Sequence, residues 1–244
     1  MISIDDLQAH WQRDWIKAPG VEDRTTQVHW MQCGPYYADL RIPDTLPDIS
    51  GARALDELDT ETLLALMRAE GFAGTVRVDD GICTWERRIN WHGTPSEIDA
   101  GRLSFDDQGA LIEDGVHAEY RELWLRCPHP PIEALGGQAD GYDVILLSSE
   151  ATFLLAVGVP EAPPATPLVA ALERGERPEG LAQHFSSLYV MGLWDGADGI
   201  ARLTTDPRMK GDAVLSRSGQ QIQVFVPGFE GGMRRMSVPL TALA

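Results

Sequence analysis

Positive charge, and lysine above all, is scarce in this chain. Of its 244 residues, 20 are Lys or Arg and 37 are Asp or Glu, which gives a formal net charge of −17. Lysine occurs only at Lys17 and Lys210, and no run of basic residues is present. Nucleic acids and anionic membranes are bound through clustered Lys and Arg, so the sequence predicts neither of them as a partner.

Cysteine and long apolar runs are also scarce. Cys33, Cys83 and Cys127 are odd in number and widely spaced, which argues against a disulfide framework and against a CxxC zinc site. Apolar runs such as residues 153–157 are far too short to span a bilayer, and the first residues lack the layout of a secretory signal. We therefore expect a soluble protein of a reducing compartment, the cytoplasm.

The sequence signatures of common enzyme classes are missing. There is no GxSxG, GxGxxG or P-loop pattern, and the six histidines do not occur at metal-ligand spacing. The sequence therefore predicts no catalytic residue, no metal site and no cofactor.

The chain does contain many short segments of alternating polarity, separated by glycine-containing turns. One example is the turn at residues 79–81, Asp-Asp-Gly, which joins two such segments and is typical of an antiparallel hairpin. One helix in each half and the lack of βαβ alternation predict an all-β fold with a few short helices, built as antiparallel barrels or sandwiches.

Three regions are expected along the chain. Residues 1–24 are predicted to be a helical lead-in, because Leu7, Trp11 and Trp15 are four residues apart. Residues 25–130 and 140–244 are predicted to form two β units, separated by a Pro- and Gly-rich boundary near residues 128–141. The second unit repeats the order of elements in the first.

A group of aromatic and charged side chains is concentrated in the strands of the first unit. Charged residues that share an inward face with tryptophan must find a partner, water or a ligand, because an unpaired buried charge costs several kcal/mol. Two interpretations follow, a ligand-binding cavity or a structural ion-pair network. The candidate binding residues are Trp30, Tyr37, Asp39, Arg41, Trp85, Arg87, Trp91, Glu122 and Trp124.

Several strings of the first unit resemble landmarks of bacterial proteins related to the fungal Hri family of lipocalin-like proteins. The resemblance covers about residues 25–127. It implies two antiparallel lipocalin-like β-barrels in tandem, of the calycin type, with no assigned biochemical activity. The strings are residues 28–32 (Val-His-Trp-Met-Gln), 36–43 (Tyr-Tyr-Ala-Asp-Leu-Arg-Ile-Pro), 84–87 (Thr-Trp-Glu-Arg), 99–103 (Asp-Ala-Gly-Arg-Leu), 113–115 (Glu-Asp-Gly) and 120–124 (Tyr-Arg-Glu-Leu-Trp).

Three functional hypotheses follow from these observations. In the first, the first barrel binds a small hydrophobic or amphipathic molecule, whose polar end meets Arg41 or Arg87. In the second, the barrels are filled and act as a protein-interaction scaffold. In the third, the chain is an isomerase- or hydrolase-type enzyme that uses Asp39, Glu122 and His92 as inward acid and base. The sequence leaves the oligomeric state open.

Overall fold

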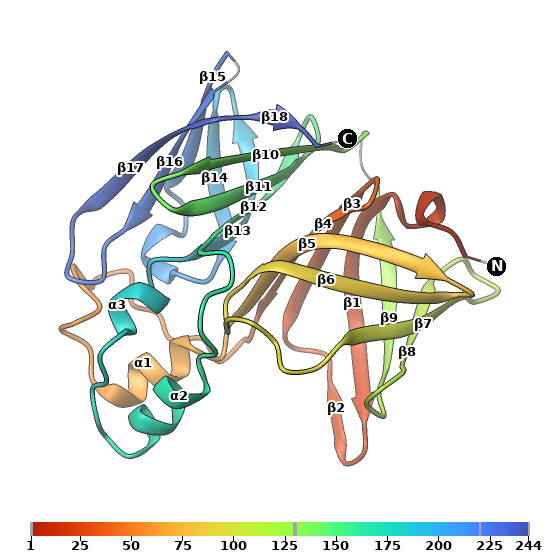
Figure 1. The fold of residues 1–244 in the computed structure, drawn as a ribbon, viewed down its shortest axis with the longest axis horizontal. Coiled ribbons are helices and arrows are strands. Elements are labelled where there is room, and N and C mark those ends of the chain that lie inside the picture. The colour runs from red at the N-terminus through yellow and green to blue at the C-terminus, as the bar shows by residue number, and fades with distance from the viewer. Residues whose placement is uncertain (1, 129–130, 220, 244) are drawn as a thin grey trace.

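In the computed structural model, which describes residues 2–128, 131–219 and 221–243, the chain forms two antiparallel sheets and a few short helices (Figure 1). The predicted all-β class with two tandem antiparallel barrels is thereby confirmed. No helix in the described part of the chain has both the length and the apolar character needed to cross a bilayer.

The strands of the first sheet are β1 (Ala9–Ala18), β2 (Val21–Asp23), β3 (Gln27–Cys33), β4 (Tyr36–Ile42), β5 (Glu70–Asp79), β6 (Ile82–Asn90), β7 (Asp99–Phe105), β8 (Leu111–Gly115) and β9 (Arg121–Cys127). Those of the second sheet are β10 (Glu133–Ala139), β11 (Tyr142–Ser148), β12 (Thr152–Gly158), β13 (Leu188–Asp195), β14 (Asp198–Thr204), β15 (Ala213–Ser218), β16 (Gln221–Pro227), β17 (Met233–Pro239) and β18 (Thr241–Ala242). The helices are η1 (Ile4–Leu7), α1 (Thr60–Leu66), α2 (Thr166–Glu173), α3 (Leu181–His184) and η2 (Pro207–Met209).

Each sheet curls round on itself. In the first sheet, β1 pairs with β3 on one side and with β9 on the other, so the hydrogen-bonded ring is complete and β2 extends from it. In the second sheet, β10 pairs with β11 and β18, and β17 lies against β10. Ring closure removes the exposed strand edges that would otherwise promote aggregation.

The two halves share one order of elements, as the sequence predicted. A hairpin, β3–β4 or β11–β12, is followed by a helical segment, α1 or α2 with α3. A meander of five strands, β5–β9 or β13–β17, then completes each sheet. The helical segments lie together at one end of the molecule (Figure 1).

The helix predicted within residues 1–24 is wrong. Apart from the short η1, this segment is extended, and β1 sits inside the first sheet, where Trp11 is directly opposite Trp30. Residues four apart share a face in a strand as well as in a helix. The charged Arg13 at a buried position of β1 masks the alternating pattern that would have indicated a strand.

The second sheet begins earlier than residue 140. Strand β10 starts at Glu133, within the segment predicted to be a linker. Two glycines suggested flexibility there, but they are needed for close packing. A Cβ on Gly136 would collide with Leu243, and a Cβ on Gly137 would collide with the chain around residues 238–239.

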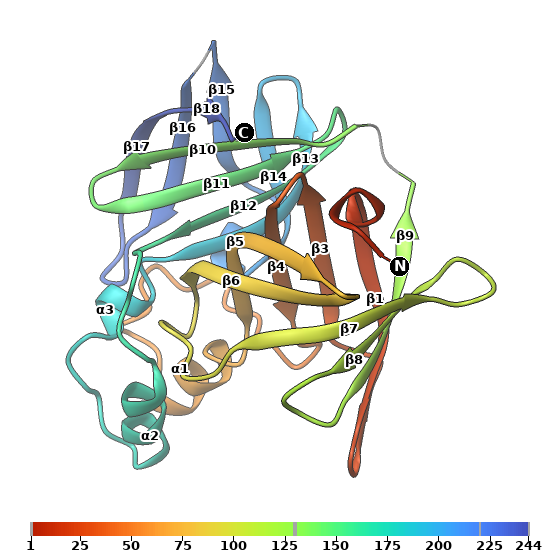
Figure 2. The same ribbon diagram turned by 45° about the vertical axis from the view of Figure 1, so that its right-hand side comes forward.

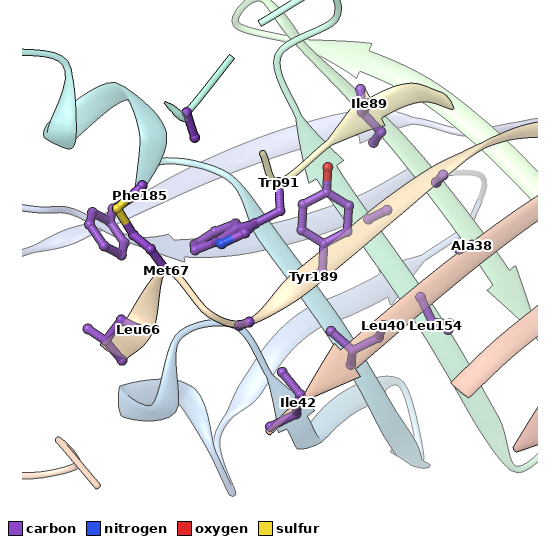
Figure 3. Close-up of a cluster of buried hydrophobic side chains, with 14 of the residues drawn as sticks. Ala38, Leu40, Ile42, Leu66, Met67, Ile89, Trp91, Leu154, Phe185 and Tyr189 are labelled. Carbon is purple, nitrogen blue, oxygen red and sulfur yellow. The ribbon is translucent and has the colours of Figure 1, made fainter. Parts of the chain in front are cut away.

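The buried apolar side chains of the described residues form three cores. One fills the interior of the second barrel, one lies inside the first barrel, and the largest lies between the two sheets. The inter-sheet core is built from the outer faces of β3–β5 and of β11–β13 together with the helices, and Figure 3 shows a part of it around Trp91, Tyr189 and Phe185. As a result, β4 and β12 are buried on both faces and the sheets pack face to face (Figure 2).

Candidate functional site

The first barrel encloses a cavity of about 210 Å³, which we call the first-barrel cavity. Its walls come from strands on all sides of the ring, so residues far apart in the sequence meet there. Inward orientation follows from the two-residue alternation of each strand. Seven of the nine residues predicted from the sequence line it: Trp30, Asp39, Arg41, Trp85, Arg87, Glu122 and Trp124.

Three tryptophans form the aromatic wall of the first-barrel cavity. The ring of Trp30 packs edge-on against Trp85 and Trp124, with centroid separations of 5.8 and 5.6 Å. The indole N–H of Trp30 donates to Gln32 Oε1 at 3.0 Å. Since edge-to-face aromatic pairs stabilise one another beyond simple burial, these rings form a rigid wall.

Each of the two cavity arginines has its own carboxylate partner. Arg41 Nε donates to Asp39 Oδ1 at 2.9 Å, and Arg87 Nη2 donates to Asp99 Oδ2 at 2.5 Å. Both guanidinium groups also lie over the ring of Phe72, at 5.1 and 3.6 Å from its centroid. Burial raises the pKa of Asp39 to about 6, and the charge of Arg41 opposes this rise.

Two glutamates face each other across the β8–β9 hairpin, where Glu113 is directly opposite Glu122. Tyr120 Oη donates to Glu113 Oε1 at 2.7 Å, and Trp124 Nε1 donates to Glu113 Oε2 at 3.1 Å. Burial, followed by the charge of Glu122, raises the pKa of Glu113 to about 8. Glu113 is therefore largely protonated at neutral pH, whereas Glu122 accepts a hydrogen bond from the buried Arg13 at 2.8 Å.

Sequence reasoning missed five residues of the lining. Glu113 was missed because it precedes Asp114-Gly115, a dipeptide typical of turns, whereas β8 continues to Gly115 and the loop follows it. A pairing register for that hairpin would have placed Glu113 beside Glu122. The missed residues are Ile16, Phe72, Asp99, Glu113 and Tyr120.

Two predicted site residues lie outside the cavity lining, and the inward orientation predicted for Trp91 is wrong. Tyr37 is buried against Phe72, with ring centroids 6.1 Å apart. Trp91 lies in the inter-sheet core and packs on Phe185 and Tyr189 (Figure 3). A β-bulge explains the position of Trp91: Arg88 has no opposite residue on β5, so the facing pattern reverses after it.

The acid–base set proposed from the sequence does not assemble. His92 follows β6, and its Nε2 lies 2.7 Å from the carbonyl oxygen of Met67. It does not line the cavity that contains Asp39 and Glu122. Within the described ranges, no group of three or more His, Cys, Asp or Glu side chains is arranged to hold a metal ion.

Two further hollows adjoin the first-barrel cavity. A pocket of about 420 Å³ shares Arg87, Asp99 and Tyr120 with its lining. A groove of about 840 Å³ runs between the sheets. In its lining, Arg88 Nε and Asp143 Oδ2 form an ion pair at a distance of 2.5 Å.

Comparison with known proteins supports the fold alone. No family model and no curated protein matches the chain. A solved structure of an uncharacterised protein from Saccharomyces cerevisiae, YLR301w, is similar, with a TM-score of 0.53 and 13% sequence identity. The similarity covers 97% of this chain and 99% of that one, and at this level of identity it concerns the two-barrel architecture only.

Proposed function

We propose that the first barrel binds a small, partly apolar molecule in the first-barrel cavity. The difference between the two barrels carries this proposal. The interior of the second barrel is a continuous apolar core that includes Phe153, Leu155 and Val224. The first-barrel cavity instead keeps four carboxyl groups and two guanidinium groups next to tryptophan rings. Apolar residues fill a structural core at lower cost than buried charges do, so the polar lining points to a ligand.

The size of the cavity limits the ligand. Pockets for drug-sized ligands usually have volumes of roughly 300–1,000 Å³, and the first-barrel cavity measures about 210 Å³. Long fatty acids and retinoids do not fit this volume, but a molecule with one ring does. The pocket that shares Arg87, Asp99 and Tyr120 offers a route by which such a molecule reaches the cavity.

Binding is favoured over the two other hypotheses. A scaffold of filled barrels is at odds with the cavity in the first barrel. An enzyme that uses His92 together with Glu122 is at odds with the position of His92, whose imidazole is held at Met67. We also propose that the chain is one of the bacterial relatives of the fungal Hri family, with lipocalin-like barrels. A cytoplasmic location is part of the proposal too, and the free state of Cys33, Cys83 and Cys127 supports it.

A thermal-shift screen with small ring-containing acids, alcohols and amines tests the proposal. At a ligand concentration of 100 times Kd, binding stabilises a protein by about 2.7 kcal/mol, so Tm should rise by roughly 5 to 10 °C for a chain of this size. The variant Ile16→Phe fills the cavity and should abolish the shift. The matched variant Leu125→Phe adds similar bulk at an exposed position of β9 and should keep it. If no compound in the screen shifts Tm, the proposal is wrong.

A further inference from the structure

The carboxylate of Glu122 has one oxygen engaged and one oxygen without a partner. Oε1 accepts a hydrogen bond from Arg13 Nη1 at 2.8 Å and lies 3.9 Å from Arg41 Nη1. Oε2 is buried and has no hydrogen-bond partner in the described structure. The whole residue is only 1% exposed and lines the first-barrel cavity. Leaving a buried charged oxygen unsatisfied is costly, so this atom calls for a donor.

Each of the other charged residues of the lining has at least one partner. Arg41 and Arg87 donate to Asp39 and Asp99, respectively. Both oxygens of Glu113 accept hydrogen bonds from neighbouring side chains. None of these hydrogen bonds involves Glu122 Oε2, so a ligand that places a donor beside this oxygen satisfies it.

The aromatic part of the lining points the same way. The faces of tryptophan rings attract cations, and Trp30, Trp85 and Trp124 belong to the same lining as Glu122. Aromatic rings combined with a carboxylate are the chemistry that recognises a small organic ammonium group.

We propose that the ligand of the first barrel is a small amine, an inference that rests on the proposed function. Its ammonium group donates to Glu122 Oε2, and its apolar body lies among the tryptophan rings. A cavity of about 150 Å³ is large enough to bind benzene, so the first-barrel cavity, at about 210 Å³, has room for one ring and a short amine arm.

Three probes of nearly the same shape test the charge preference in the unmodified protein: benzylamine, benzyl alcohol and benzoate. Calorimetric titration should show benzylamine binding about ten- to a hundredfold more tightly than benzyl alcohol, the range expected for a hydrogen bond to a buried charge. Benzoate should bind most weakly of the three.

Each outcome decides between the two proposals. If benzyl alcohol or benzoate binds as tightly as benzylamine, the amine proposal is overturned and the proposed function stands. If benzylamine fails while another compound of the thermal screen binds in a way that Ile16→Phe blocks, the amine proposal alone falls. If no compound binds, both fall.

Two matched variants locate the preference. Glu122→Gln keeps the shape of the side chain and removes its charge, and it should reduce the preference for benzylamine over benzyl alcohol to near onefold. Glu119→Gln makes the same change at an exposed position outside the lining and should keep the full preference. Continued binding of benzyl alcohol shows that the Glu122 variant is folded. If that variant does not fold, the three-probe series in the unmodified protein still decides.

Discussion

Glu113 should make the stability of the protein fall as the pH rises from about 4.5 to about 8. The carboxyl group is buried beside Glu122, and its pKa is raised from 4.5 to about 8. A carboxyl with a raised pKa holds its proton in the folded state at a pH where the unfolded chain has released it. The stabilisation is complete below pH 4.5 and is lost as the pH rises through 8. The change to test is Glu113→Gln, which resembles the protonated acid and does not titrate.

The size of the effect follows from proton linkage. One pKa unit corresponds to about 1.4 kcal/mol, so between about pH 6.5 and pH 8 the free energy of unfolding should fall by about 2 kcal/mol. The other shifted groups act mainly outside this pH range, and the thiols and phenols whose pKa burial raises act above it. Asp39 has a pKa of about 6 in the folded protein, and burial lowers the pKa of His29 to about 4 and that of His184 to about 3.

Urea unfolding followed by tryptophan fluorescence, repeated at several pH values, measures this slope. The unmodified protein should lose stability between pH 6.5 and pH 8, while Glu113→Gln should be nearly flat and the more stable of the two at pH 8. Glu119→Gln, an exposed change, should follow the unmodified protein. A flat profile for the unmodified protein, or an unchanged slope in Glu113→Gln, would refute the reasoning.

Two further predictions concern packing and buried charge. Arg13→Met removes the partner of the buried Glu122 and of Asp23 and should destabilise by about 3 kcal/mol or more, whereas Arg24→Met, at an exposed ion pair, should have a much smaller effect in the same urea assay. Gly71→Ala should cost about 1–3 kcal/mol, because its Cβ would collide with the buried ring of Tyr189. Gly51→Ala meets no neighbour and should be close to neutral; equal losses from the two glycine variants would contradict this packing argument.

Local patterns were enough to predict the all-β class and most of the cavity wall. The turn after Asp79, with Asp80 and Gly81 at positive φ, joins β5 to β6 as predicted. Period-two alternation then placed Trp85 and Arg87 on the inward face. Both inferences depend only on residues that are close together in the sequence.

Features that depend on distant partners were not predictable in this way. Arg13 is stable inside the barrel because Glu122, 109 residues away, meets it there, and without that partner β1 did not resemble a strand. The bulge at Arg88 arises from the pairing of β5 with β6, and it turned Trp91 away from the cavity. A short sequence window contains neither interaction.

The core between the two sheets determines whether the two barrels can be separated from each other. Because β4 and β12 are buried on both faces, division of the chain between Cys127 and Glu133 would leave each fragment with an apolar sheet face exposed to water. Such fragments would adhere to one another or to themselves, so the contribution of each barrel has to be studied in the uncut protein. By the same logic, a protein with a single barrel of this kind would have to form a dimer that buries the same apolar face.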